Sequence, residues 1–193
     1  MMQHAPLFIV LLPVSAALLC MLFSRMQKNL GSWIVIGSIA AAFMSAVTVL
    51  QQVIADGGKP IHYWMGNWQP PLGIEFVIDP ISGVLAVLIT FISLLGSLYS
   101  LPFVKEEGWL HVGGYYTLYG LMTVGMCGMV ITGDVFNLYV FLEVMSLSGY
   151  GLIALGGKKS MLAAFRYLLI GTIGASLYLL GVGYMYALTG TLN

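Results

Sequence analysis

One acidic residue in this sequence stands where a carboxylate is costly and where it can do chemistry. Glu143 lies in the stretch FLEVMSLSGY, inside an apolar run from Val135 to Leu155 that has no other charge. At about 1.5 Å per helical residue, it is roughly 13 Å from Asp134 and roughly 18 Å from Leu155, which is mid-membrane depth. A charge there costs about 3 kcal/mol, and such residues usually face the bundle interior and serve ion or proton pathways. We therefore expect Glu143 to bind and release a proton; the alternative is a protonated or paired glutamate that only joins helices.

Hydroxyl groups lie above and below Glu143 on the same predicted helical face. Tyr139, Ser146 and Tyr150 stand at positions i−4, i+3 and i+7 from the glutamate, and residues with this spacing share one side of a helix. Such groups can hold water molecules or relay protons, and they can equally make ordinary hydrogen bonds between helices. Asn137 falls on a different face, so we assign it no role.

A second charge, Arg166, falls inside the last apolar run, residues 161–188. It can act on Glu143 through water, or it can extend its side chain to the membrane surface. A short loop joins the two runs, so we expect antiparallel neighbouring helices. Arg166 would then lie about 10 Å nearer the inner surface than Glu143, which disfavours a direct ion pair.

The helices that position these residues follow from composition. The chain has 193 residues, 60% hydrophobic and 7% charged, whereas soluble domains carry about 25% charged residues. Too little polar surface remains to cover a soluble particle, so we expect an integral membrane protein in contact with the lipid bilayer. Seven basic and seven acidic residues balance, which gives no basic face for nucleic acid. Cys20 and Cys127 occupy different apolar segments and are interpreted as small buried hydrophobic residues.

Six apolar runs approach the length of about 20 residues that a helix needs to cross the membrane. This predicts an all-α polytopic bundle that forms one membrane domain over residues 1–193. The first run is interpreted as a retained helix rather than a signal peptide, because its basic residues follow it. The expected helices cover residues 6–23, 33–54, 80–101, 114–132, 135–155 and 161–188.

The segment 56–79 between the second and third runs is rich in glycine, proline and tryptophan. It predicts an outer loop that can include a short hairpin, with Trp64 and Trp68 at the level of the lipid headgroups. Asp79 before Pro80 is a good helix start, and Asp134 is expected to cap the helix that carries Glu143.

Basic residues predict the orientation, because cytoplasmic loops carry more of them. The loops after the first, third and fifth runs lie on one side, and the other side has only Lys59. We therefore expect a multi-pass protein of the cell (inner) membrane with both termini outside. The five basic residues of the inner loops are Arg25, Lys28, Lys105, Lys158 and Lys159.

The sequence has no phosphate-binding glycine loop, no histidine–cysteine metal cluster and no nucleophile triad. His4, His62 and His111 are scattered and are expected in solvated loops. We expect no catalytic site, cofactor or metal in this chain.

Three segments carry a resemblance to a known family. GDVFNLYVFLEVMSLSGYGLIAL, residues 133–155, resembles the fifth helix of the antiporter-like subunits, and AAFRYLLIGTIGASLYLLGVGYMYALTGTLN, residues 163–193, resembles their sixth. FVIDPISG, residues 76–83, resembles the start of their third helix. The family includes the proton-pumping subunits of complex I, the Mrp sodium/proton antiporters and the membrane-bound group 4 hydrogenases. The amino-acid sequence of residues 133–193 is most similar to the last two.

The resemblance implies a function and a set of partners. In the family the fifth-helix glutamate belongs to the proton path, which transfers to Glu143. A basic residue, usually lysine, begins the sixth helix; here it is Arg166, which is effectively always protonated and so is expected to tune Glu143 rather than accept its proton. Family members are built as two inverted repeats, and the first repeat contains a broken seventh helix that bears a lysine. This chain ends before that helix, so we expect either a split protein whose partner chain supplies it, or a fragment.

Three hypotheses follow for the function. The first is a proton- or sodium-translocating subunit of a hetero-oligomeric membrane complex of the respiratory oxidoreductase, hydrogenase or antiporter type. The second is a structural half subunit that bridges other membrane subunits without moving ions. The third, a small independent carrier, is disfavoured because transporter sites usually form between paired repeats.

Overall fold

Six long helices make up most of this protein. The computed structural model describes residues 4–27, 29–70, 73–104 and 109–193; Lys28 and Lys105, which the orientation prediction used, lie outside them. Each helix is long and apolar enough to cross a membrane, which confirms the predicted all-α bundle with six spans. The helices are α1 Ala5–Met26, α2 Leu30–Ala55, α3 Pro80–Val104, α4 Trp109–Ile131, α5 Val135–Ala154 and α6 Lys158–Thr189.

Three helices, α2, α4 and α6, begin at least three residues earlier than apolar character alone predicts. His111, expected in a loop, lies near the start of α4, and Lys158 and Lys159 form the start of α6 instead of a loop. These predictions were wrong because hydropathy marks the part of a helix that lies in hydrocarbon. The backbone can continue its helical hydrogen bonds beyond that region, where polar side chains meet water.

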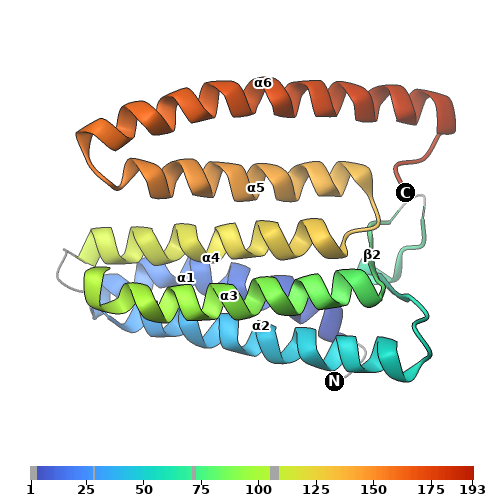
Figure 1. Ribbon diagram of the computed structural model, residues 1–193, viewed down its shortest axis with the longest axis horizontal. Helices are drawn as coiled ribbons and strands as arrows, with labels where there is room; N and C mark the ends of the chain where they lie inside the picture. The colour runs from blue at the N-terminus through green and yellow to red at the C-terminus, as the bar shows by residue number, and fades with distance from the viewer. Residues whose placement is uncertain (1–3, 28, 71–72, 105–108) are drawn as a thin grey trace.

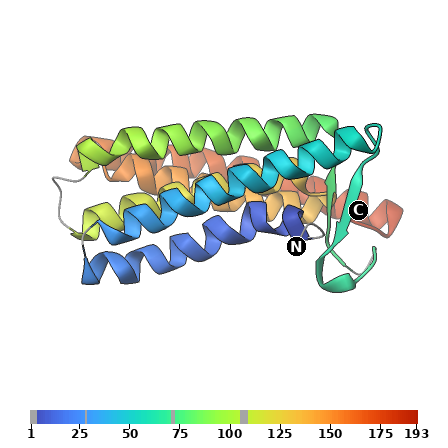
Figure 2. The ribbon, with the colours of Figure 1, turned by 90° about the horizontal axis from the view of Figure 1, so that it is seen from below.

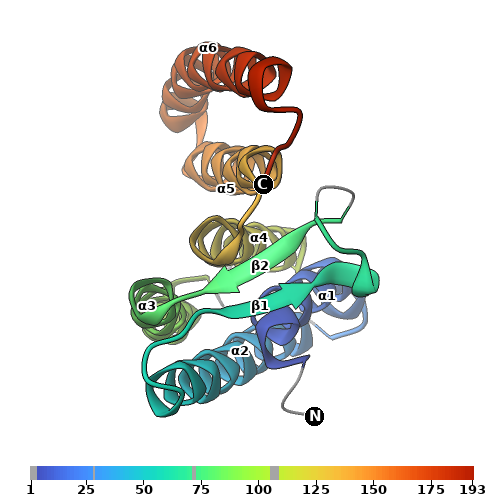
Figure 3. The ribbon, with the colours of Figure 1, turned by 90° about the vertical axis from the view of Figure 1, so that its right-hand side faces the viewer.

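The helices are arranged in two parts: a thick part, which is the packed bundle of α1 to α4, and a thin part, which is the pair α5 and α6. Helices α1 to α4 pack together, α5 lies on α4, and α6 lies on the far side of α5 (Figures 1 and 3). In the span of α4 44% of the residues are buried, but in the span of α6 only 11% are. The α5–α6 pair therefore presents most of its surface to whatever surrounds this chain.

Side-chain hydroxyls join α3 to α4 inside the thick part. The Tyr116 hydroxyl donates to the Ser97 carbonyl oxygen at 3.2 Å and lies 3.0 Å from the Ser100 hydroxyl. The Tyr119 hydroxyl donates to the Ser93 carbonyl oxygen at 3.0 Å. Interhelical hydrogen bonds of this kind stabilise membrane bundles, in which lipid tails compete with apolar packing. Cys20 and Cys127 are free and buried in the bundle, as predicted.

A short hairpin lies across one end of the bundle, where both termini of the described chain are also found (Figure 2). Strand β1, Ile61–Trp64, pairs antiparallel with β2, Glu75–Ile78, so that Trp64 stands opposite Glu75. The 3₁₀ turn η2, Met65–Asn67, follows β1. We call this end of the bundle the hairpin end, and the end with the α5–α6 connection the loop end.

Aspartates cap α3 and α5, as predicted. The Ser82 backbone N–H donates to Asp79 Oδ1 at 2.7 Å, and the Asp79 N–H donates to Ser82 Oγ at 2.8 Å. The Asn137 N–H donates to Asp134 Oδ1 at 2.6 Å. Each bond satisfies a backbone donor that the first turn of a helix leaves free, so both helices begin at fixed positions.

Glycines bring α4 and α5 into close contact. A side chain at Gly125 would place its Cβ 2.6 Å from the Met145 backbone nitrogen, and one at Gly128 would overlap the Phe141 ring. Small residues at such positions allow helix backbones to approach closely in membranes. The α4–α5 distance is therefore set by the absence of side chains at these two glycines.

We predict that Gly128→Ala lowers the melting temperature of the purified protein. The added methyl group forces Phe141 to move, and overpacking of this kind costs about 1–3 kcal/mol. The matched control is Gly114→Ala in the same helix, where the Cβ meets no atom within 4 Å. The control should match or slightly exceed the parent, because alanine favours helix more than glycine does. Equal melting temperatures for the two variants would contradict this account of the α4–α5 distance.

Candidate functional site

The two faces of α5 have different character. Phe141 and Met145 face the glycines of α4, and Phe141 also packs against Phe76 of the hairpin with ring centroids 6.3 Å apart. Tyr139 and Tyr150 instead contact α6. Glu143 and Ser146 share the helical face of these two tyrosines. We call these four residues, Tyr139, Glu143, Ser146 and Tyr150, the polar stripe.

The hairpin-end member of the stripe, Tyr139, stacks on Tyr178 of α6. The ring centroids are 6.3 Å apart and the planes differ by 8°. The Tyr178 hydroxyl donates to the Val135 carbonyl oxygen at 3.1 Å, which fixes this ring to the first turn of α5.

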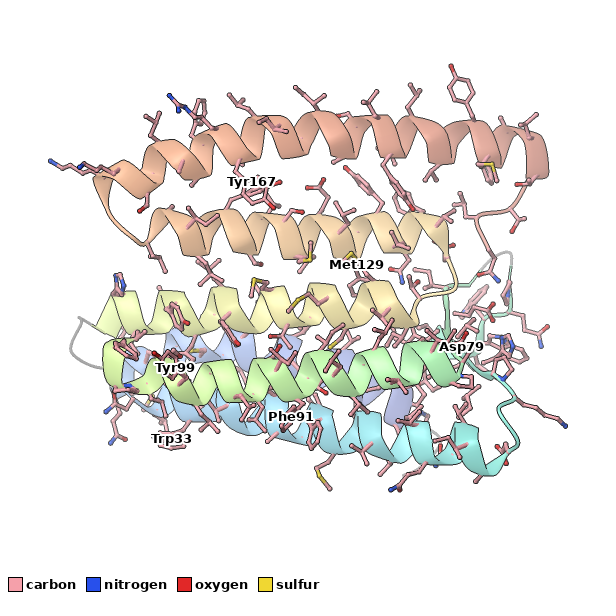
Figure 4. All side chains as sticks on the ribbon, in the orientation of Figure 1. Trp33, Asp79, Phe91, Tyr99, Met129 and Tyr167 are labelled. Atoms are coloured by element: carbon pink, nitrogen blue, oxygen red, sulfur yellow. The ribbon has the colours of Figure 1, made fainter. Side chains whose placement is uncertain are left out.

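The loop-end member, Tyr150, meets Tyr167 of α6 edge to face. The ring centroids are 4.8 Å apart with an interplanar angle of 76°, and Figure 4 shows Tyr167 between the two helices. Tyr150 is only 7% exposed, and its hydroxyl occupies the place that a side chain at Gly171 would need. Close approach of α5 and α6 here therefore depends on a glycine.

Both tyrosine pairs give the same axial position for Glu143. Glu143 follows Tyr139 by four residues in α5. Because α6 runs antiparallel to α5, the matching position in α6 lies four residues before Tyr178, at Gly174. The seven residues from Tyr150 to Glu143 match the seven from Tyr167 to Gly174. Glu143, which is half-buried, thus lies at the level of Gly174 and Ala175 along α6; of these two residues, Ala175 is buried and Gly174 is exposed. The carboxylate stands, in this axial sense, between two pairs of aromatic rings.

Arg166 lies apart from the polar stripe. It is exposed and stands eight residues before Gly174, about 12 Å along α6. It also follows a different direction from its neighbour Tyr167, by about 100° around the helix. Within the described part of the chain the one ion pair joins His62 to Glu75, so Arg166 and Glu143 are not paired, in keeping with the expected separation.

Sequence reasoning missed Tyr167 and Tyr178, the α6 partners of the stripe. One signal was available: both share a helical face with Gly171 and Ala175, the small residues of α6. Sequence spacing identifies such a face, but the axial alignment of α6 on α5 comes only from the structure.

Sequence reasoning also missed Glu75, a buried carboxylate at the hairpin end. Trp64 Nε1–H donates to Glu75 Oε2 at 3.1 Å, and His62 Nδ1 lies 3.3 Å from the same oxygen. The Asn193 side-chain amide donates to Oε1 at 2.8 Å. Glu75 therefore joins the hairpin to the segment that follows α6.

Backbone bonds extend this connection to α5. The Gly133 N–H donates to the Glu75 carbonyl oxygen at 3.0 Å, and the Val135 N–H donates to the Leu192 carbonyl oxygen at 2.9 Å. We call the set of bonds around Glu75, Gly133, Val135, Leu192 and Asn193 the outer clasp, where outer refers only to its place at the hairpin end of the bundle. It fixes the start of α5 and the end of α6 to the hairpin.

Comparisons with known proteins agree with this architecture. Residues 132–193, which include α5 and α6, match the family described as "NADH:quinone oxidoreductase/Mrp antiporter, TM". An NADH-quinone oxidoreductase subunit of Desulforudis audaxviator is 43% identical over 193 residues, which is 100% of this chain and 38% of that protein. A Na(+)/H(+) antiporter subunit of Bacillus subtilis is 34% identical over 188 residues, 95% of this chain and 37% of that protein.

A solved structure gives the same result for the fold. The membrane-bound sulfane sulfur reductase, an archaeal respiratory membrane complex, contains a chain that superposes with a TM-score of 0.90 at 31% identity. The match covers 99% of this chain and 38% of that one. The chain therefore spans less than half the length of the relatives that it matches.

We predict that the outer clasp is sensitive to acid. Burial raises the pKa of Glu75, but the hydrogen bonds from Asn193, His62 and Trp64 outweigh it and hold the pKa below its ordinary value. A carboxyl group whose pKa is lower in the folded state stabilises the fold at pH values above its ordinary pKa of about 4.3. This stabilisation is lost as the pH falls through the pKa of the folded state. Glu75→Gln should therefore melt below the parent at neutral pH.

The pH dependence of that difference is the measurement. The gap in melting temperature between parent and Glu75→Gln should shrink as the pH falls below about 4. Asp56→Asn, which removes a carboxylate at the exposed end of α2, is the control and should melt like the parent. A gap that stays constant with pH would mean that the ionised form of Glu75 does not hold the clasp.

Proposed function

We propose that this chain, which belongs to the antiporter-like subunit family, is an ion-translocating subunit of a multisubunit membrane complex and that Glu143 binds the proton that moves. The observation that carries the proposal is the position of Glu143 in the polar stripe: it is half-buried, on the face of α5 whose tyrosines contact α6, at the level of the buried Ala175. A carboxylate at this depth is costly to ionise, so its presence is best explained by a cycle of proton binding and release. The moving ion is the proton itself or sodium exchanged for it.

Proton binding at this site responds to nearby charge. A positive charge that approaches a carboxylate favours its ionised form, and withdrawal of that charge favours proton uptake. A lysine on a helix beyond this chain's described residues would supply the movable charge, as the family resemblance implies. Arg166 supplies a fixed positive charge nearer the loop end. The two charges couple ion binding to events elsewhere in the complex.

Other membrane helices complete the site in this proposal. The α5–α6 pair is largely exposed in this chain, and Glu143, which α6 leaves half-exposed, would meet hydrocarbon there at a cost of a few kcal/mol. Helices of another chain, or of a longer form of this one, cover the pair. In the membrane, the hairpin end with both termini faces outward, and residues 1–193 act as one membrane domain.

A second candidate is a structural subunit that bridges its neighbours without moving ions. One observation favours it: the Tyr178 hydroxyl is bound to the Val135 carbonyl oxygen and so serves helix packing. In this alternative the stripe joins helices, and Glu143 stays protonated. The two candidates differ in whether the titration of Glu143 is required.

We predict that Glu143→Gln leaves the complex assembled and reduces ion movement to near background. Glutamine keeps the shape and the hydrogen-bonding capacity of the side chain but cannot titrate. Proton uptake and sodium extrusion are measured in vesicles, with assembly checked by purification of the complex. Glu143→Asp, which keeps a titratable group, should retain part of the activity. Near-normal transport by the glutamine variant would leave the structural candidate.

We predict that Arg166→Ala impairs transport more than Arg166→Lys does. The reason is that lysine can replace a fixed positive charge in part, whereas alanine removes it. The same vesicle assay tests both variants, and Lys159→Ala at the start of α6 is a control for loss of a nearby charge. If Arg166→Ala transports ions at the rate of the parent, the arginine only anchors α6 at the membrane surface.

A further inference from the structure

We propose that the two tyrosine pairs are gates that control access to Glu143 from the two sides of the membrane. Tyr139 and Tyr178 form the hairpin-end gate, and Tyr150 and Tyr167 form the loop-end gate. The inference rests on the proposed role of Glu143 and adds two α6 residues, Tyr167 and Tyr178, to that site.

The position of the rings supports gating. Tyr139 precedes Glu143 by four residues, about 6 Å along α5, and Tyr150 follows it by seven, about 10 Å. Each ring contacts a second ring from α6, so each pair bridges the interface. Between the pairs, the buried residue of α6 is Ala175, whose methyl group is too short to obstruct water. Access along the α5–α6 interface is therefore decided at the two pairs.

The two gates differ in how firmly they are held. At the hairpin end, Tyr178 is bound to the Val135 carbonyl oxygen at 3.1 Å. The same residue, Val135, is bound to Leu192 through its N–H. This gate is tied to the outer clasp and is the fixed one.

At the loop end, one partner packs less closely against the rest of this chain. Tyr150 is 7% exposed and sits against Gly171, whereas Tyr167 is 53% exposed. Rotation of Tyr167 about its side-chain bonds would remove one ring from the pair without disturbing the packing of Tyr150. The loop-end gate is therefore the one that opens, and Tyr167 is its moving part.

The test measures access to position 143 rather than transport. Glu143→Cys is introduced into the assembled complex in membrane vesicles of known orientation, and its reaction with a membrane-impermeant thiol reagent is timed from each side. The complex without this substitution gives the background, because Cys20 and Cys127 are fully buried. Slow labelling from both sides is expected for Glu143→Cys alone.

Opening the loop-end gate should raise the labelling rate from that side several-fold. Gly171→Ala should do so by displacing Tyr150, and the matched control Gly183→Ala should not, because its Cβ meets no atom within 4 Å. Tyr167→Ala should have the same effect as Gly171→Ala without added bulk, whereas Tyr167→Phe keeps the ring and should label like the parent. Tyr178→Ala should raise the rate from the hairpin side alone.

These outcomes separate the gates from the transport role. Unchanged labelling in Tyr167→Ala and Gly171→Ala, with the complex intact, would overturn the loop-end gate. The assignment of the pairs to the two sides would be overturned if Tyr167→Ala or Gly171→Ala increased labelling from the hairpin side. It would also be overturned if Tyr178→Ala increased labelling from the loop side. Because labelling reports access and not ion movement, the gates can fail while Glu143→Gln still abolishes transport, and the reverse also holds.

Discussion

The cost of placing a carboxylate in hydrocarbon is the constraint on which the α5–α6 pair depends. A charge at that depth must face protein or water rather than lipid. The helix that carries Glu143 meets this need by dividing its surface: apolar side chains face the glycines of α4, and the polar stripe faces α6. At the level of Glu143 the buried residue of α6 is Ala175, and its short side chain lets the two helices pack closely there.

The rest of the fold supplies a firm support for this pair. Hydroxyl bonds between α3 and α4, such as that from Tyr119 to the Ser93 carbonyl oxygen, hold the thick part together. The glycines of α4 then bring α5 to a defined distance. By contrast, α6 packs mainly on α5, through contacts that include two aromatic pairs and one hydroxyl bond, and the outer clasp joins its end to the hairpin. The buried share of the spans decreases from 44% in α4 to 17% in α5 and 11% in α6, toward the region where we propose the functional movement.

Much of the fold could be predicted from the sequence, because the signals are local. Hydropathy identified the six spans, and the capping roles of Asp79 and Asp134 followed from their place before apolar runs. The shared face of Tyr139, Glu143 and Tyr150 followed from helical spacing. Helix ends were less predictable, as the start of α6 at Lys158 illustrates, since a helix does not stop where the hydrocarbon does.

The site could be predicted only in part, because its other half depends on how helices are aligned. No local pattern reports that Tyr178 stacks on Tyr139, since this depends on the axial position of α6. Glu75 and Asn193 are 118 positions apart, and nothing near either residue indicates the contact. The roles proposed for the polar stripe and for Arg166 stay predictions, and the experiments above test them.

The outer clasp also has a mechanical meaning. The hairpin is bonded to Gly133, and two residues later Val135 is bonded both to Leu192 and to the Tyr178 hydroxyl. A pull on the hairpin is thus transmitted through these short bonds and the first turn of α5 to the aromatic stack nearest Glu143. A molecule that bound the hairpin would therefore contact one end of a continuous chain of bonds whose other end is the Tyr139–Tyr178 stack.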